Sequence, residues 1–169
     1  YDLTTLQREA NSRFGFSAKT TLGVAQALYE KHKALTYPRT DSQYLPEDYL
    51  PNAKAALQSL EGAHPAGVFA KEALRSGWVD SAGRRVFDNK KVSDHFAIIP
   101  TLQTPKSLSE IEAKLYDMVV KRFLAVFFPP AEFMVTTRIS TVKATVKAGA
   151  QEHKFQTNGK VLVKPGWMA

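Results

Sequence analysis

The sequence contains no cysteine, which excludes disulfide bonds, thiolate zinc sites and cysteine nucleophiles. It also lacks any apolar run near the roughly 20 residues that cross a bilayer, and no basic and apolar leader follows its first residues. The four histidines are scattered without the spacing of metal ligands. The chain starts at Tyr1 instead of Met. We therefore expect an excised segment of a cytoplasmic protein without a membrane span.

Acidic residues are in the minority, because 23 Lys and Arg stand against 16 Asp and Glu and give a net charge of +7. The excess is uneven: residues 129–169 hold six basic side chains against two acidic ones, whereas residues 43–88 hold five against six. A basic chain favours a polyanionic partner, most simply nucleic acid. The alternative is a protein that is basic for no functional reason. The hydrophobic fraction of 44% is sufficient for a folded core.

Helical patterns open the chain. Residues 4–7 (TTLQ) predict a capping box, Gly15 predicts the end of the first helix, and Ser17 predicts the cap of a second one. Two short helices joined in this way resemble a helix-turn-helix, although an ordinary helical hairpin is the commoner arrangement. Lys19 would lie near the second helix's N-terminus, where unpaired N–H groups favour a phosphate.

In the rest of the chain, the spacing of apolar residues changes near residue 129 from a helical to an alternating pattern. Before it, we expect a short strand over residues 34–37, helices over 46–62 and 65–76, and a turn at 81–85 between extended pieces. A capping box at Ser109 and Glu112 predicts the longest helix, which Pro129 ends. After it, alternating residues predict three short strands, with breaks at 149–150 and 158–159. The fold class is therefore α+β, with a helical, winged-helix-like domain over 1–128 and a partial antiparallel β domain over 129–169.

Residues 35–42 (LTYPRTDS), which we name the tyrosine segment, gather a phenol, a guanidinium, hydroxyls and a carboxylate. A tyrosine in water titrates near pH 10, so at pH 7 only about one in a thousand is ionised, and a nearby cation reduces this deficit of about 4 kcal/mol. Arg39, two residues after Tyr37, carries a planar fork that suits phosphate oxygens. Arg39 can therefore hold a phosphate while Tyr37 attacks it.

The tyrosine segment closely resembles the active-site motif of type IA DNA topoisomerases, and its proline after the tyrosine resembles the topoisomerase III branch. Three further stretches are similar to that family in the same order. Residues 1–6 (YDLTTL) resemble the entry into its tyrosine-bearing domain, and residues 93–101 (SDHFAIIPT), here named the histidine segment, resemble its second active-site strip. Residues 159–167 (GKVLVKPGW) resemble the return into its arch-forming β domain.

The resemblance implies a fragment of a bacterial, nucleoid-associated enzyme that cleaves single-stranded DNA through a transient 5′-phosphotyrosine link, passes a strand and reseals without ATP. It implies catalytic roles for Tyr37, Arg39 and His95, with His95 near the scissile phosphate. Asp41 would orient His95 or Arg39, or cap its own turn. The expected DNA-binding residues are Lys19, Thr40, Asp41, Ser42, Lys90 and Lys91.

The resemblance also implies Mg²⁺, which the family binds through acidic residues of a separate N-terminal Toprim domain. No Asp-x-Asp pair occurs in this sequence, so we expect no metal site within the chain and an inactive fragment. Two alternatives stay open: a non-catalytic helix-turn-helix module that prefers duplex DNA, and an interaction domain. A tyrosine recombinase is excluded, because its nucleophile follows its arginines and histidine near the C-terminus, whereas Tyr37 comes early.

Overall fold

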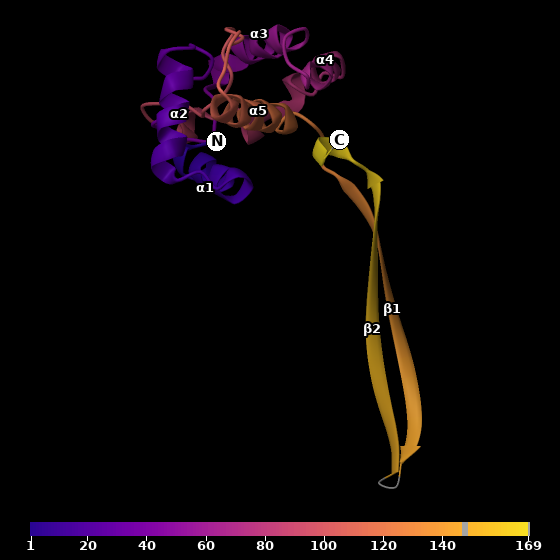
Figure 1. Ribbon diagram of the computed structural model, residues 1–169. Coiled ribbons are helices and arrows are strands. Elements are labelled where there is room, and N and C mark those ends of the chain that lie inside the picture. The colour runs from indigo at the N-terminus through magenta and orange to yellow at the C-terminus, as the bar shows by residue number, and fades with distance from the viewer. Residues whose placement is uncertain (147–148, 169) are drawn as a thin grey trace. The chain divides into compact units, whose positions relative to one another are not determined.

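The structure is a computed structural model that describes residues 1–146 and 149–168. The chain divides into two compact units, Tyr1–Phe128 and Pro129–Ala169. The first is helical and the second is a long antiparallel hairpin (Figure 1). The expected α+β class is confirmed. No helix in the described ranges is long and apolar enough to cross a membrane.

Five α-helices build the first unit, and three short 3₁₀ helices connect them. The order is α1 (Leu3–Phe14), α2 (Ala18–Glu30), η1 (Glu47–Tyr49), α3 (Leu50–Leu60), α4 (Gly67–Arg75), η2 (Asp80–Arg85), η3 (Asn89–Lys91) and α5 (Glu110–Ala125).

Helices α1 and α2 form the expected two-helix element. Gly15 ends α1 in the left-handed conformation with φ 70°, and the Ser17 side chain accepts a hydrogen bond from the Thr20 backbone, so both predictions are confirmed. The predicted cap at residues 4–7 is wrong. Asp2 caps α1 instead, accepting a hydrogen bond from the Thr5 backbone at 2.6 Å. A carboxylate is the stronger acceptor and also complements the helix dipole.

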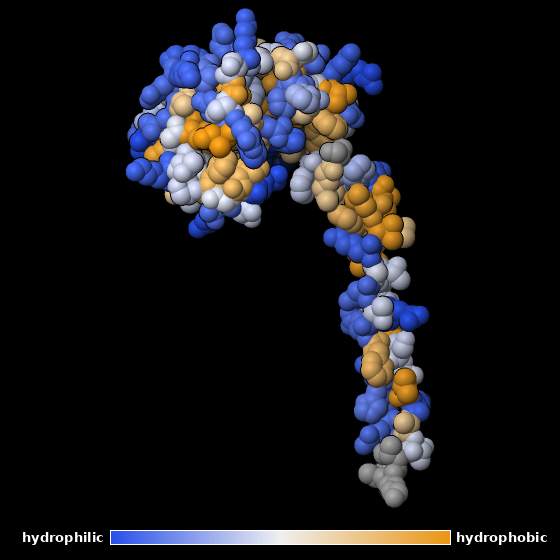
Figure 2. Space-filling model, in the orientation of Figure 1, coloured by the Kyte–Doolittle hydropathy of each residue, from blue (hydrophilic) through white to orange (hydrophobic). Residues whose placement is uncertain are grey.

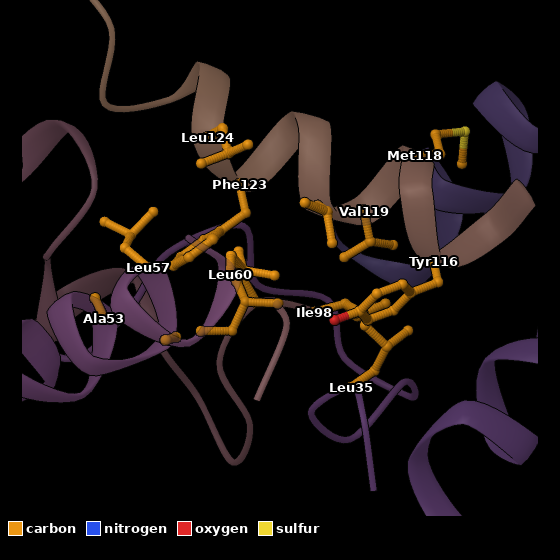
Figure 3. Close-up of a cluster of buried hydrophobic side chains, with 14 of the residues drawn as sticks. Leu35, Ala53, Leu57, Leu60, Ile98, Tyr116, Met118, Val119, Phe123 and Leu124 are labelled. Carbon is orange, nitrogen blue, oxygen red and sulfur yellow. The ribbon is translucent and has the colours of Figure 1, made fainter. Parts of the chain in front are cut away.

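Helix α5 supports the core of the first unit. The predicted capping box of Ser109 and Glu112 is confirmed, and Val119 and Phe123 are buried. Figure 3 shows the Phe123 side chain beside Leu57 and Leu60 of α3. Phe127 lies beyond the end of α5 and is buried.

Two expectations for the connecting segments are wrong. Residues 81–85 belong to the 3₁₀ helix η2, where a turn between extended pieces was predicted. Residues 34–37 form no strand, and only an isolated bridge joins Leu35 to Pro100. Leu35 and Ile98 are nevertheless 1% exposed, and their side chains reach the Tyr116 ring in the core (Figure 3). Burial therefore anchors both segments without a regular ladder.

A glutamate links α5 to the end of α2. The Glu112 carboxylate accepts hydrogen bonds from the Ser109 backbone and hydroxyl, both at 2.8 Å, and lies 3.2 Å from His32 Nε2. The Ser109 backbone hydrogen bond is the largest cause that lowers the pKa of Glu112 to about 2, and the pair with His32 adds to it.

We expect this carboxylate to make stability depend on pH. A folded-state pKa below the ordinary 4.5 means that the stabilisation is complete above 4.5 and is lost as the pH falls toward about 2. The measurement is urea unfolding of the wild type and of Glu112→Gln from pH 7 to pH 2. The difference in unfolding free energy should shrink across the acidic range, and a constant difference down to pH 2 would contradict the prediction.

Gly67 begins α4 in direct contact with the end of α3. A Cβ at this position would overlap the Leu60 carbonyl oxygen and would lie 2.7 Å from that of Glu61. These are backbone atoms that cannot rotate away, so Gly67→Ala should destabilise the first unit by about 1–3 kcal/mol. Gly62, in the same connection, has open space around the corresponding position and is the matched control. Chemical denaturation should separate the two variants; equal stabilities would refute the overlap.

The second unit pairs β1 (Glu132–Val146) with β2 (Gly149–Lys164) as antiparallel strands, and the register shifts once, between Glu132 and Phe133. Three short strands were predicted, and this is wrong. No glycine or proline interrupts residues 132–146, so β1 runs through them as one strand. The predicted break at 158–159 lies inside β2, where Asn158 pairs with Thr137 and accepts its hydroxyl at 3.0 Å. Gly149 begins β2 as expected of a break, while residues 147–148 lie outside the described residues.

Apolar side chains line the hairpin without cover from the described part of the second unit (Figure 2). Met134 and Val135 are neighbours on opposite faces and are 63% and 64% exposed. Strands with apolar residues on both faces are typical of sheets that are covered on both sides.

Candidate active site

The tyrosine segment lies against the histidine segment through a set of backbone and hydroxyl hydrogen bonds. The Thr36 backbone donates to the Ile99 carbonyl at 3.0 Å, and its hydroxyl donates to the Ala97 carbonyl at 2.9 Å. The same hydroxyl accepts from the Ile99 backbone at 2.9 Å. Thr36 therefore fixes the register of the two segments immediately before Tyr37.

The start of the chain joins the same assembly. The Leu3 backbone donates to the Thr40 carbonyl at 3.0 Å, and the Ile98 backbone donates to the Tyr1 carbonyl at 2.8 Å. Three of the stretches singled out in the sequence, at residues 1–6, 35–42 and 93–101, thus meet at one place in the first unit.

Tyr37 and His95 are brought together. Their ring centroids are 4.2 Å apart with the planes tilted by 40°, Tyr37 is half-buried and His95 is exposed. The Thr40 hydroxyl donates to the His95 carbonyl at 3.0 Å, which fixes the backbone beneath the imidazole. The phenol ring and the imidazole ring therefore lie against each other.

Arg39 is exposed, and its hydrogen bond in the described structure is a long one, from Nη2 to Gln26 Oε1 at 3.5 Å. No salt bridge is recorded for it among the described residues. Residues 36–40 form no strand, so the spacing of two residues does not by itself place Tyr37 and Arg39 on one face. Its guanidinium remains accessible to an anion beside the tyrosine segment.

The predicted DNA-binding residues fall into two groups. Thr40 and Ser42 are 8% and 5% exposed. The Thr40 hydroxyl bonds to the histidine segment, whereas the Ser42 hydroxyl donates to the Lys91 carbonyl at 2.7 Å and joins the tyrosine segment to η3. Asp41 is exposed and accepts from the Ser93 hydroxyl at 3.0 Å. This bond joins Asp41 to the histidine segment, whereas the sequence suggested His95 or Arg39 as its partner.

The three predicted lysines are exposed, and they differ in position. Lys91 Nζ donates to the Tyr44 hydroxyl at 2.9 Å and lies 4.3 Å from that ring's centroid. The hydrogen bond with Tyr44 is the main cause that raises the pKa of Lys91. Lys90 lies beside it in η3, and Lys19 lies in the first turn of α2. Lys90 and Lys91 are therefore tied to the tyrosine segment through Ser42.

Sequence reasoning missed two residues of α2. The Tyr29 ring meets Tyr37 edge-on, with centroids 5.5 Å apart and an interplanar angle of 81°, and Gln26 accepts the hydrogen bond from Arg39. The helical period places positions i and i+3 on one face, which is the signal that pairs Gln26 with Tyr29. The period alone did not indicate what that face meets.

Within residues 1–146 and 149–168, no group of three or more acidic or histidine side chains has a geometry for holding a metal ion. The residues of the described chain therefore do not fit a Mg²⁺ site.

The comparison with known families agrees with the resemblance that the tyrosine and histidine segments carry. Residues 1–169 match the family model described as DNA topoisomerase. The chain therefore belongs to the DNA topoisomerase family. Its similarity to type IA enzymes of the topoisomerase III branch, expected from the motifs, is confirmed.

The curated relatives carry the name DNA topoisomerase 3. The chain is 46% identical over 169 residues to that of Shouchella clausii (strain KSM-K16), covering 99% of this chain and 22% of the relative. It is 44% identical over 171 residues to that of Bacillus subtilis (strain 168), covering 100% of this chain and 22% of the relative. The solved full-length topoisomerase I from Thermotoga maritima is 25% identical with a TM-score of 0.58, covering 99% of this chain and 26% of that one. The chain thus spans less than a quarter of these curated relatives' length.

Proposed function

We propose that this chain is the tyrosine-bearing DNA-cleavage segment of a type IA DNA topoisomerase. The observation that carries the proposal is the contact between Tyr37 and His95, whose ring centroids lie 4.2 Å apart in two segments joined by hydrogen bonds. A ring pair in an ordinary core would be fully buried, whereas here His95 is exposed. The substrate proposed is single-stranded DNA.

The proposed reaction is a reversible transfer of one phosphodiester. The Tyr37 oxygen forms a bond to phosphorus, the bond from phosphorus to the 3′ oxygen of the preceding nucleotide breaks, and that oxygen leaves as a hydroxyl after taking a proton. The product is a 5′-phosphotyrosine. Since one phosphate ester replaces another, resealing requires no ATP.

Each side chain has a distinct part in this proposal. Arg39 neutralises charge on the phosphate oxygens, and His95 donates a hydrogen bond to the same group. The residues that contact the DNA strand are Lys19, Lys90, Lys91 and Asp41. Thr40 contributes by holding the tyrosine segment against the histidine segment, and Ser42 contributes by holding it against η3. The buried hydroxyls of Thr40 and Ser42 support this division.

The proposal extends to the parts of the molecule. Residues 1–128 are the cleavage domain and residues 129–169 a piece of the arch-forming β domain, which agrees with the two compact units and with apolar residues on both hairpin faces. Mg²⁺ is bound by a Toprim domain elsewhere in a longer cytoplasmic enzyme. The greater length of the relatives supports the proposal that metal binding and the tyrosine lie in different parts of one longer chain.

The purified chain alone should bind single-stranded oligonucleotides weakly, in the micromolar range or above, and should leave a negatively supercoiled plasmid unchanged with Mg²⁺. Each phosphate that it neutralises should add about −0.7 to the slope of log affinity against log salt. Fluorescence anisotropy over a salt series, with duplex of the same sequence as the competitor, tests the preference. Stronger binding to duplex would favour a helix-turn-helix module, and relaxation by the chain alone would refute the split site.

A further inference from the structure

One face of α2 meets the two reactive residues of the tyrosine segment. The Tyr29 and Tyr37 rings meet in a T-shaped arrangement at a centroid distance of 5.5 Å, and Gln26 accepts a hydrogen bond from Arg39 at 3.5 Å. With His95 at 4.2 Å, the Tyr37 ring has two aromatic neighbours that come from different parts of the chain. Neither Tyr29 nor Gln26 has a role in the proposed chemistry.

Helix α2 is a rigid base for such a contact. Its other face carries Val24, Ala25 and Leu28, all 6% exposed or less, and α2 packs against α5. Ser17 caps its start, so the helix is fixed at one end by a hydrogen bond and along its length by burial.

The chain then turns directly from α2 into the tyrosine segment. Lys33 adopts the left-handed conformation with φ 54°, which non-glycine residues rarely adopt. The Ala34 backbone donates to the Leu28 carbonyl at 2.8 Å, which closes the turn onto the last part of the helix. Tyr29 and Tyr37 are thus joined by a short connection that is hydrogen-bonded to the helix at Leu28, and the histidine segment holds its far end through Thr36.

The geometry points to Tyr29 as a positioning residue for Tyr37, holding the phenol in the orientation from which its oxygen reaches the phosphate. The inference rests on the proposed function. The hydroxyl oxygen lies on the axis about which the ring flips, so only a swing of the whole side chain about its Cα–Cβ bond displaces the attacking atom. A T-shaped aromatic neighbour restricts that swing, because a displaced ring loses the favourable contact. Attack depends steeply on alignment of the reacting atoms.

The test uses the full-length enzyme that contains this segment. Tyr29→Leu removes the ring, and Tyr29→Phe keeps it without the hydroxyl. Single-turnover cleavage of a labelled single-stranded oligonucleotide is measured at saturation, together with the dissociation constant and the thermal midpoint. Tyr29→Leu should slow cleavage roughly 2- to 12-fold without weakening DNA binding. Tyr29→Phe should cleave at the wild-type rate.

Phe14→Ala is the matched control, because it removes one ring of a separate aromatic pair, Phe14 and Phe16, with centroids 5.3 Å apart. Cleavage at the wild-type rate by Tyr29→Leu would overturn the inference, as would equal slowing by Tyr29→Phe or by Phe14→Ala. Tyr37→Phe, run in parallel, tests the proposed function separately. If that variant still forms the covalent adduct, Tyr37 is not the nucleophile and the proposed function is wrong, independently of the result for Tyr29.

Discussion

Replacing Tyr37 with phenylalanine should abolish the covalent protein–DNA adduct in the full-length enzyme and leave the fold intact. Only one oxygen is lost, and the ring contacts with Tyr29 and His95 are kept. The loss should be complete, because the missing oxygen is the atom that forms the bond to phosphorus. The measurement is a denaturing gel after incubation with end-labelled single-stranded DNA.

Tyr116→Phe is the control for this experiment. The Tyr116 hydroxyl is buried without a hydrogen-bond partner, and burial raises its pKa to about 12. Removing it takes away one tyrosine oxygen from the same unit without breaking a hydrogen bond, so that variant should form adduct normally. Adduct formation by Tyr37→Phe would show that another residue is the nucleophile.

Arg39→Lys should slow cleavage although it preserves the charge. Lysine offers no planar fork, and the loss of one hydrogen bond to a charged group costs about 1.5–3 kcal/mol. If that contact strengthens in the transition state, the rate falls roughly ten- to a hundredfold. Single-turnover cleavage at saturating DNA measures the effect directly.

Arg13→Lys is the appropriate comparison for Arg39→Lys. Arg13 is also a surface arginine of the first unit, and it pairs with Glu9 at 2.6 Å in α1. A conservative exchange there should leave the cleavage rate unchanged. If Arg39→Lys cleaves DNA at the wild-type rate, the planar fork of Arg39 is not required and its positive charge is sufficient.

Local chemistry was predictable from the sequence where a few neighbouring residues decide the outcome. Ser17, Gly15 and the pair of Ser109 and Glu112 act within one helical turn, and the structure has all of them in the expected roles. The cap of α1 was not predictable in the same way, because two acceptors, Asp2 and Thr4, compete within the same turn. The stronger acceptor prevailed.

Contacts between distant residues were predictable only in part. Only the resemblance to a known family predicted that Tyr37 and His95 belong to one site, because no local pattern links residues so far apart in sequence. The pairing of Thr137 with Asn158 depends on the register of a whole hairpin, and an Asn-Gly pair read alone predicts a turn. The contact between Tyr29 and Tyr37 depends on how the turn at Lys33 directs the chain, and no periodicity reports that direction.

The base of the hairpin closes on itself, which affects how its length can change. The Trp167 backbone donates to the Pro129 carbonyl at 3.0 Å, and a Cβ on Gly166, at φ 51°, would lie 2.5 Å from the Pro130 carbonyl oxygen. The residues just before β1 and just after β2 are therefore held together. One residue pair added across the strands would extend the hairpin by about 3.4 Å and leave its base in place. One residue added to a single strand would exchange the two faces beyond it. Variation in hairpin length should therefore come in matched pairs.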